Sequence, residues 1–125
     1  SFVQWVTERL RRNEKTNVVI DQYNNPTFAD SLVEVIFRLF DLDKNGTFHV
    51  TGKECISRYE FAKAISRKFS LNEKLLNPIT TAELNQVARR PEKLNMKVDK
   101  VERITGIKML NVNEGLDRLI MQMGK

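Results

Sequence analysis

The chain contains few of the residues that the best-known catalytic and binding motifs require. It has one cysteine, Cys55, one histidine, His49, and five glycines that stand apart from one another. A lone cysteine cannot form an internal disulfide, so we expect an inert thiol and a cytoplasmic setting. One histidine gives little support to a histidine-rich metal site or a Ser-His-Asp triad. Because the isolated glycines form no Gly-x-Gly-x-x-Gly turn, we expect this chain to bind no dinucleotide cofactor by itself. With a single histidine we also expect no metal site.

Long apolar runs are also missing. The stretch from Leu32 to Phe37 is interrupted by Glu34 and closed by Arg38, whereas a bilayer span needs about 20 apolar residues. The first residues show none of the regions of a signal peptide. We therefore expect no membrane partner.

The composition is that of an ordinary folded domain. The chain has 125 residues, of which 41% are hydrophobic and 30% charged, and its net charge is +5. This length suits a single domain, 1–125. Seven basic and three acidic residues lie between Arg89 and Lys108, which fits either a solvated basic face or an anion site for a phosphorylated small ligand. No nucleic-acid-binding motif accompanies the charge, so we expect no nucleic-acid partner.

Hydrophobic periodicity predicts helices alternating with short strands, which is an α/β class, here an α+β-like fragment. A helix begins near Thr27, and we expect Thr27 to cap it. This helix is apolar around most of its circumference and should therefore pack on two sides. Ser57 and Glu60 have the spacing of a capping box, and Gly106 marks a helix end. The strands are too few for a complete doubly wound sheet, which indicates a piece of something larger. The predicted helices are 2–13, 27–40, one from 57, 81–84, 98–105 and one from 113, and the predicted strands are 17–21, 47–51 and 75–80.

Two short motifs resemble chemical sites but lack the necessary context. Asp41 to Gly46 matches the first half of a calcium-binding EF-hand loop, but Gly52 stands where the bidentate glutamate is required. We interpret the segment as a polar turn. Tyr59 and Lys63 have the Tyr-x-x-x-Lys spacing in which lysine assists proton transfer by tyrosine. Without a nearby nicotinamide-binding turn, we interpret Tyr59 as a packing residue and predict no catalytic residue in this chain.

Four sequence blocks, in this order along nearly the whole chain, resemble one family. They are Val18 to Thr27 (VVIDQYNNPT), Gly46 to Gly52 (GTFHVTG), Ser57 to Ala62 (SRYEFA), and Arg90-Pro91 followed by Leu94 to Val98. Together they are similar to the later part of dTDP-4-dehydrorhamnose reductases, which are extended short-chain dehydrogenase/reductases of dTDP-rhamnose biosynthesis.

The resemblance implies that the chain is the C-terminal substrate-binding portion of an NAD(P)H-dependent oxidoreductase. The N-terminal Rossmann half, which holds NADP or NAD and the catalytic residues, would be absent, and the chain alone would be inactive. Its partners would be the dTDP-sugar and the missing Rossmann half, with self-association possible through apolar surface that this half would cover. The regulatory β subunit of methionine adenosyltransferase has similar blocks, so a non-catalytic interaction module is the alternative.

The resemblance also suggests substrate-binding residues. Arg90 would offer paired donors to the pyrophosphate of the dTDP-sugar, and Gln22 and Asn25 would line the sugar pocket from a loop. Each has an ordinary structural alternative. Arg90 fits a surface arginine before a proline, and the two amides fit polar side chains that satisfy their own turn.

If Asp41 to Gly46 is a plain turn, calcium should have no effect on the protein. Titration with millimolar calcium is expected to leave both the fluorescence of Trp5 and the melting temperature unchanged, because no bidentate carboxylate completes the loop. A saturable fluorescence change, or a rise in melting temperature with calcium, would show that the interpretation is wrong.

Overall fold

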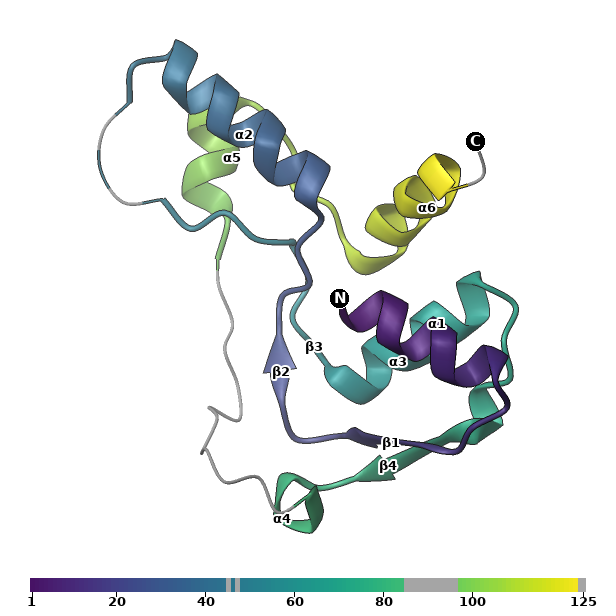
Figure 1. The fold of residues 1–125 in the computed structure, drawn as a ribbon. Helices are drawn as coiled ribbons and strands as arrows, with labels where there is room; N and C mark the ends of the chain where they lie inside the picture. The colour runs from purple at the N-terminus through teal and green to yellow at the C-terminus, as the bar shows by residue number, and fades with distance from the viewer. Residues whose placement is uncertain (45, 47, 85–96, 124–125) are drawn as a thin grey trace. The chain divides into compact units, whose positions relative to one another are not determined.

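The computed structural model describes residues 1–44, 46, 48–84 and 97–123 (Figure 1). These residues form two compact units, the first from 1–24 and 56–84, and the second from the described residues of 25–55 and 97–123. Each unit is assembled from two separate stretches of chain. The single-domain organisation expected from the chain length stays a prediction.

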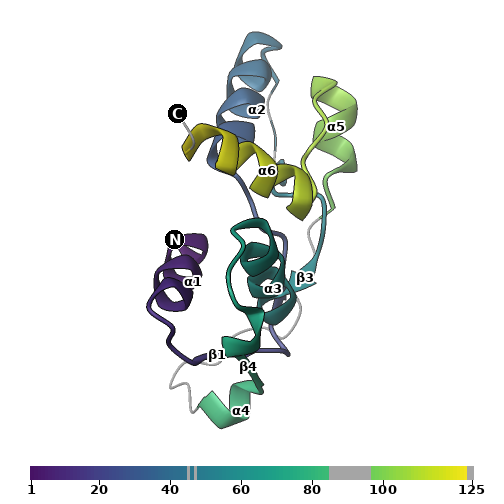
Figure 2. The ribbon, with the colours of Figure 1, turned by 90° about the vertical axis from the view of Figure 1, so that its right-hand side faces the viewer.

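The first unit is built on a short parallel strand pair covered by two helices. Strand β1 (Thr16–Val19) pairs in parallel with β4 (Leu76–Ile79), with Thr16 opposite Leu76 and Val19 opposite Ile79. Helices α1 (Phe2–Arg11) and α3 (Arg58–Lys68) contact each other and β1 (Figures 1 and 2). The core between them consists of Val6, Leu10, Val18, Val19, Phe61, Ala62, Ile65, Leu76 and Ile79.

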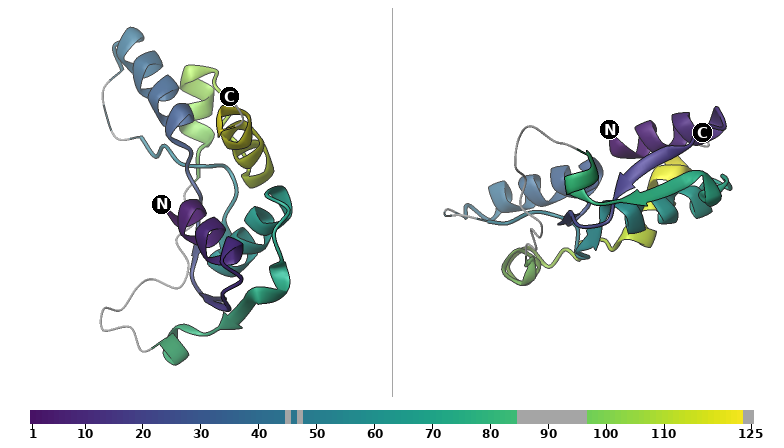
Figure 3. Two further views of the ribbon diagram at one scale, coloured as in Figure 1. Left: turned by 45° about the vertical axis from the view of Figure 1, so that its right-hand side comes forward. Right: turned by 90° about the horizontal axis from the view of Figure 1, so that it is seen from below.

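Three small elements complete this unit. Strands β2 (Tyr23–Asn24) and β3 (Ile56–Ser57) form a two-residue antiparallel pair. A 3-10 turn, η1 (Glu73–Leu75), leads into β4, and the short helix α4 (Thr81–Leu84) follows it. One residue separates the end of β4 from the start of α4, and the view from below shows the two parallel strands β1 and β4 side by side (Figure 3).

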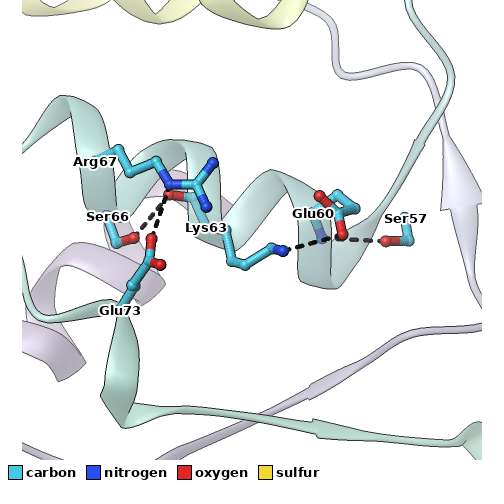
Figure 4. Close-up of polar contacts among 6 residues, drawn as sticks. All are labelled: Ser57, Glu60, Lys63, Ser66, Arg67 and Glu73. Carbon is cyan, nitrogen blue, oxygen red and sulfur yellow. Dashed lines mark hydrogen bonds and ion pairs between the residues drawn. The ribbon is translucent and has the colours of Figure 1, made fainter.

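Helix α3 begins where the sequence predicts. The Ser57 hydroxyl accepts a hydrogen bond from the Glu60 backbone N–H at 3.0 Å, which satisfies one of the otherwise unpaired donors of the first turn. The Glu60 carboxylate pairs with Lys63 Nζ at 3.2 Å (Figure 4). At the other end, Arg67 Nε lies 2.8 Å from Glu73 Oε2 and joins the helix to η1.

The second unit contains three helices, α2 (Ala29–Asp41), α5 (Asp99–Thr105) and α6 (Val112–Met123). Val35 of α2 packs against Val98, Val101 and Met109, with four partly buried residues around them, Leu39, Phe48, Val50 and Ile107. Gly106 ends α5 with a φ of 74°, as the sequence predicts.

Gly52 is required by the packing of this unit. A Cβ at Gly52 would overlap the carbonyl oxygen of Pro26. The Gly52 backbone also accepts from Asn25 Nδ2 at 3.0 Å and donates to the Thr27 hydroxyl at 3.3 Å. A side chain at this position would therefore disrupt a close contact between two loops.

Most of the predicted elements are confirmed, with ends shifted by one or two residues, but two predictions are wrong. Residues 48–51 form no strand, because no strand among the described residues pairs with them, and His49 is exposed there. Thr27 does not cap α2. The helix follows Phe28 without a side-chain cap, since the Thr27 hydroxyl donates to the Asn25 carbonyl at 3.1 Å and accepts from Gly52.

Removing the cap of α3 is expected to destabilise the chain. Ser57→Ala should lower the free energy of unfolding by about 1 kcal/mol, because the Glu60 N–H loses its acceptor. Urea unfolding followed by circular dichroism measures the difference. Ser57→Thr is the matched control, since it keeps the hydroxyl and should recover most of the stability. Equal losses in the two variants would contradict the capping role.

Candidate functional site

The first unit carries an open groove on its helix-and-strand surface. It encloses about 320 Å³, which is at the lower end of the range for small-molecule sites. Helix α1, strand β1, the start of α3 and the end of α4 all contribute to it. Its lining residues are Phe2, Trp5, Asn17, Val18, Val19, Gln22, Arg58 and Leu84.

Aromatic rings form one wall of this groove. Phe2 stacks on Trp5 with ring centroids 5.8 Å apart, and Phe2 also stacks on Phe61 at 5.5 Å. The guanidinium carbon of Arg58 lies 5.0 Å from the centre of the Phe2 ring, a cation–π distance. Trp5 remains 39% exposed. The guanidinium carbon of Arg9 lies 5.1 Å from the centre of the Trp5 ring. The wall therefore combines partly exposed aromatic rings with positive charge.

A hydrogen-bonded chain of three side chains lies next to the groove, at the ends of β1 and β4. The Thr81 hydroxyl donates to Asp21 Oδ1 at 2.7 Å and accepts from Gln22 Nε2 at 3.0 Å. The Thr81 backbone N–H donates to both oxygens of Asp21, at 2.9 and 3.2 Å. The buried Gln22 amide thus donates to a residue 59 positions away.

These contacts lower the pKa of the Asp21 carboxyl. The side-chain hydrogen bond from Thr81 is the main cause, with a further contribution from the Thr81 backbone N–H, and together they hold the pKa of the Asp21 carboxyl below its ordinary value. Partial loss of hydration opposes the shift. Hydrogen bonds to the ionised form favour that form, so Asp21 is a carboxylate at neutral pH.

The three site residues expected from the sequence have different positions. Gln22 lines the groove of the first unit. Asn25 belongs to the second unit, where it is buried and donates to the Gly52 carbonyl. Arg90 lies outside the described residues. The roles of all three in substrate binding stay predictions.

Phe2, Trp5 and Arg58 were not among the expected site residues. Periodicity placed Phe2 on the buried face of the first helix, and it is indeed partly buried. Trp5 lies off the Val6–Leu10 core stripe, among charged residues, and a large apolar side chain in such a position was a usable signal. Arg58 carried no comparable signal, because only the fold brings the start of α3 next to α1.

The Tyr59–Lys63 pair forms a local contact on α3. Lys63 Nζ lies 5.1 Å from the centre of the Tyr59 ring and also pairs with Glu60 (Figure 4). In the part of the chain that the structure describes, no three His, Cys, Asp or Glu side chains are grouped as a metal site. Among the same residues, no helix combines the length and apolarity that a bilayer span requires.

A second hollow of about 540 Å³ lies along α6 and is lined in part by Glu114, Asp117 and Arg118. Two carboxylates make this surface a poor match for an anionic ligand. The described residues that line the groove of the first unit include Arg58 and no carboxylate. It is therefore the better candidate for a ligand that combines a flat ring with negative charge.

Comparison with known proteins identifies the family of the chain. The sequence profile of the RmlD substrate binding domain matches residues 1–124. A dTDP-4-dehydrorhamnose reductase of Aggregatibacter actinomycetemcomitans is 29% identical over 118 residues, which are 86% of this chain and 40% of that protein. The crystal structure of dTDP-4-dehydrorhamnose reductase from Bacillus anthracis in complex with NADP superimposes with a TM-score of 0.89 at 28% identity, over 98% of this chain and 43% of that one.

These matches define the class of the fold as the C-terminal portion of an extended short-chain dehydrogenase/reductase, a mixture of helices and few strands. The chain belongs to the RmlD substrate binding domain family. It spans less than half the length of the reductases that it matches. Methionine adenosyltransferase 2 subunit beta of Rattus norvegicus is 36% identical over 95 residues, which are 72% of this chain and 28% of that protein, so this likeness covers less of the chain.

The Thr81 hydroxyl should control the ionisation of Asp21. Thr81→Val removes this donor, so the Asp21 pKa is expected to rise towards its ordinary value, which NMR titration of the carboxyl carbon measures. Thr81→Ser keeps the hydroxyl and serves as the control. Because the folded-state pKa is lowered, the stability that the hydroxyl provides is full above about pH 4 and is lost as the pH falls through the folded pKa. Identical Asp21 titrations in the two variants would refute this assignment.

Proposed function

We propose that this chain is the substrate-enclosing part of an NAD(P)H-dependent reductase that acts on dTDP-4-dehydrorhamnose in dTDP-rhamnose biosynthesis. The observation that carries the proposal is the groove of the first unit, whose described lining residues include aromatic rings and an arginine but no carboxylate. Residues 1–124 of the chain match the substrate binding domain of this family. The names of the reductases that it resembles support the same substrate.

The groove suits the two chemically distinct parts of a dTDP-sugar. Thymine is a flat ring that can pack against the Trp5 side chain, which is 39% exposed. The diphosphate carries the negative charge, and Arg58 presents a guanidinium fork in the same groove. In this proposal the buried Gln22 amide fixes the groove wall, and Arg90 contributes a further contact to the diphosphate.

The cofactor belongs to the part of the reductase fold that lies outside this chain. When bound, NADPH or NADH supplies the hydride that reduces the keto group of the sugar. The five glycines of this chain are isolated, so these residues do not fit a dinucleotide pyrophosphate by the usual glycine-rich turn. We therefore assign no hydride-transfer step to them. Their role is to bind and orient the nucleotide sugar and to exclude water from it.

A non-catalytic regulatory module is the second candidate, favoured by the likeness to methionine adenosyltransferase 2 subunit beta. The gene sequence upstream of Ser1 separates the two. A segment with a glycine-rich nucleotide turn and a Tyr-x-x-x-Lys pair favours the reductase. An upstream segment in which both are missing favours the regulatory module.

Binding of a dTDP-sugar should depend on Trp5 and Arg58. Titration with dTDP-rhamnose is expected to quench Trp5 fluorescence, and calorimetry should show a loss of affinity in Trp5→Ala of about 1–3 kcal/mol, the usual value of stacking on one base. Arg58→Ala should weaken binding by a similar order because a charge-assisted contact is lost.

Arg103→Ala is the charge-matched control, since Arg103 is exposed on α5 in the other unit. It should leave the affinity unchanged. Failure of the wild-type chain to bind millimolar dTDP-rhamnose, or equal affinity in all three variants, would exclude the groove as the nucleotide-sugar site.

A further inference from the structure

Two polar side chains next to the groove of the first unit, those of Asp21 and Thr81, are connected to it through Gln22. Neither Asp21 nor Thr81 is among the described residues that line the groove, whereas Gln22 is. Gln22 is also buried, with 7% of its surface exposed. An effect of Asp21 or Thr81 on a ligand in the groove therefore has to pass through the Gln22 amide.

The carboxylate sets the direction of the hydrogen bonds among these three side chains. An ionised carboxylate can only accept, and a hydroxyl carries a single hydrogen. The Thr81 hydroxyl lies 2.7 Å from Asp21 Oδ1 and donates its hydrogen there. The Thr81 backbone N–H donates to the same oxygen at 2.9 Å, which holds the carboxylate in place. Because its hydrogen is already used, the Thr81 hydroxyl can only accept from Gln22.

This direction decides how the Gln22 amide is oriented. The two ends of a glutamine amide have nearly the same shape but opposite hydrogen-bonding character. The end that lies 3.0 Å from the Thr81 hydroxyl oxygen must be the donor, Nε2. A rotation of the amide by 180° would bring Oε1 against an oxygen that has no hydrogen to offer, and a buried polar group that loses its partner is costly. The carbonyl oxygen Oε1, which has two lone pairs, is therefore held at the other end of the amide.

A fixed acceptor complements the other polar group of the groove. Arg58 lines the same groove and can only donate, so it suits the oxygens of a diphosphate. A carbonyl oxygen suits a part of the ligand that donates. A dTDP-sugar has both kinds of group, because its diphosphate accepts whereas the imide N–H of thymine and the hydroxyls of the hexose donate.

We infer that Asp21 and Thr81 are positioning residues, which fix the Gln22 amide so that its carbonyl oxygen accepts a hydrogen bond from the imide N–H of thymine or from a hydroxyl of the hexose. The inference rests on the proposed function for the identity of the ligand. Asp21 sets the direction of the hydrogen bonds, Thr81 transmits it, and Gln22 contacts the ligand.

Calorimetric titration with dTDP-rhamnose tests the positioning role. Thr81→Val removes the hydroxyl, and Asp21→Ala leaves this hydroxyl able to donate to either end of the amide. Each change is expected to weaken binding about three- to tenfold, the range for a hydrogen bond between neutral groups. Thr81→Ser keeps the hydroxyl and Asp21→Asn keeps an acceptor oxygen, so both should recover most of the affinity. Equal losses in Thr81→Val and Thr81→Ser would overturn the inference.

The neighbouring threonine provides a matched control. The Thr80 hydroxyl donates to Glu83 Oε1 at 3.1 Å, which is also a threonine–carboxylate contact at the start of α4, but Thr80 is not among the described residues that line the groove. Thr80→Val should therefore bind dTDP-rhamnose as the wild-type chain does. A loss of affinity equal to that of Thr81→Val would show a general effect on α4 and would overturn the inference.

The side-chain amide of Gln22 gives a spectroscopic signature of the fixed orientation. By NMR, its protons should exchange with water on the order of tenfold faster in Thr81→Val than in Thr81→Ser, because only the serine retains the acceptor. The backbone amides of Val18 and Val19 are the internal reference. If they accelerate as much as the Gln22 side chain does, the change reflects general loosening of the unit and the positioning role is refuted.

Two simpler ligands identify the donating group. dTDP lacks the hexose, and dTDP methylated at N3 of thymine lacks the imide hydrogen as well. Tighter binding of dTDP than of the methylated compound, with the difference lost in Thr81→Val, would assign the imide N–H. A Thr81→Val effect that is seen only with dTDP-rhamnose would assign a hexose hydroxyl. An equal Thr81→Val effect on all three ligands would show that Gln22 accepts from neither group, and the inference would fail.

These outcomes are distinct from that of the proposed function. If Trp5→Ala and Arg58→Ala lose affinity for dTDP-rhamnose but Thr81→Val does not, the groove remains the nucleotide-sugar site and only the positioning role is refuted. If the wild-type chain does not bind dTDP-rhamnose, the site and the ligand contact of Gln22 are refuted together.

Discussion

The Thr81 hydroxyl joins the two ends of the parallel strand pair on which the first unit is built. It donates to Asp21, just beyond β1, and accepts from Gln22, while it belongs itself to the residue that begins α4 after β4. Two strands with four pairs of residues make a small sheet, and a sheet of this size is not stable without additional packing. Helices α1 and α3 provide that packing on one face. The hydrogen bonds among Asp21, Thr81 and Gln22 hold the ends of the two strands together. They also hold Gln22, which lines the groove, in its position.

The position of the groove follows from this arrangement. In open α/β folds, ligands bind near the carboxyl ends of parallel strands, and Val18, Val19 and Gln22 lie at that end of β1. Arg58 lies at the groove because it is the first residue of α3, directly after the cap Ser57, whose backbone pairs with β2. The cap of α3 and the β2–β3 pair therefore determine where the guanidinium lies, although neither contacts a ligand.

The sequence predicted the elements that depend on local rules. The Ser57 cap, the Gly106 helix end and the 3.6-residue periodicity of α1 and α3 are local properties, and the structure contains them. The expectation of exposed apolar surface on the second helix is confirmed at Phe37 and Phe40. A strand at 47–51 was predicted from residue type alone, but pairing is a property of two strands, and no strand among the described residues pairs with 48–51.

Fewer residues of the candidate site could be predicted from the sequence, because the site also depends on contacts between distant parts of the chain. Gln22 was selected as a loop amide, whereas its contact with Thr81 spans 59 positions and could not be read from spacing. Phe2, Trp5 and Arg58 meet only because α1 packs beside α3. Such convergence depends on tertiary structure, so the family resemblance indicated the type of ligand while the lining residues came from the structure.

The interleaved order of the chain affects how the protein can form. The first unit needs residues 1–24 and 56–84, and the second unit is built from stretches that lie between and after them. Thr16 pairs with Leu76 across a connection that includes α2, and closing so long a loop costs entropy before any strand contact is gained. During synthesis on the ribosome, β1 can therefore pair only after β4 has been made. Because the units interleave along the chain, no single cleavage releases either unit intact.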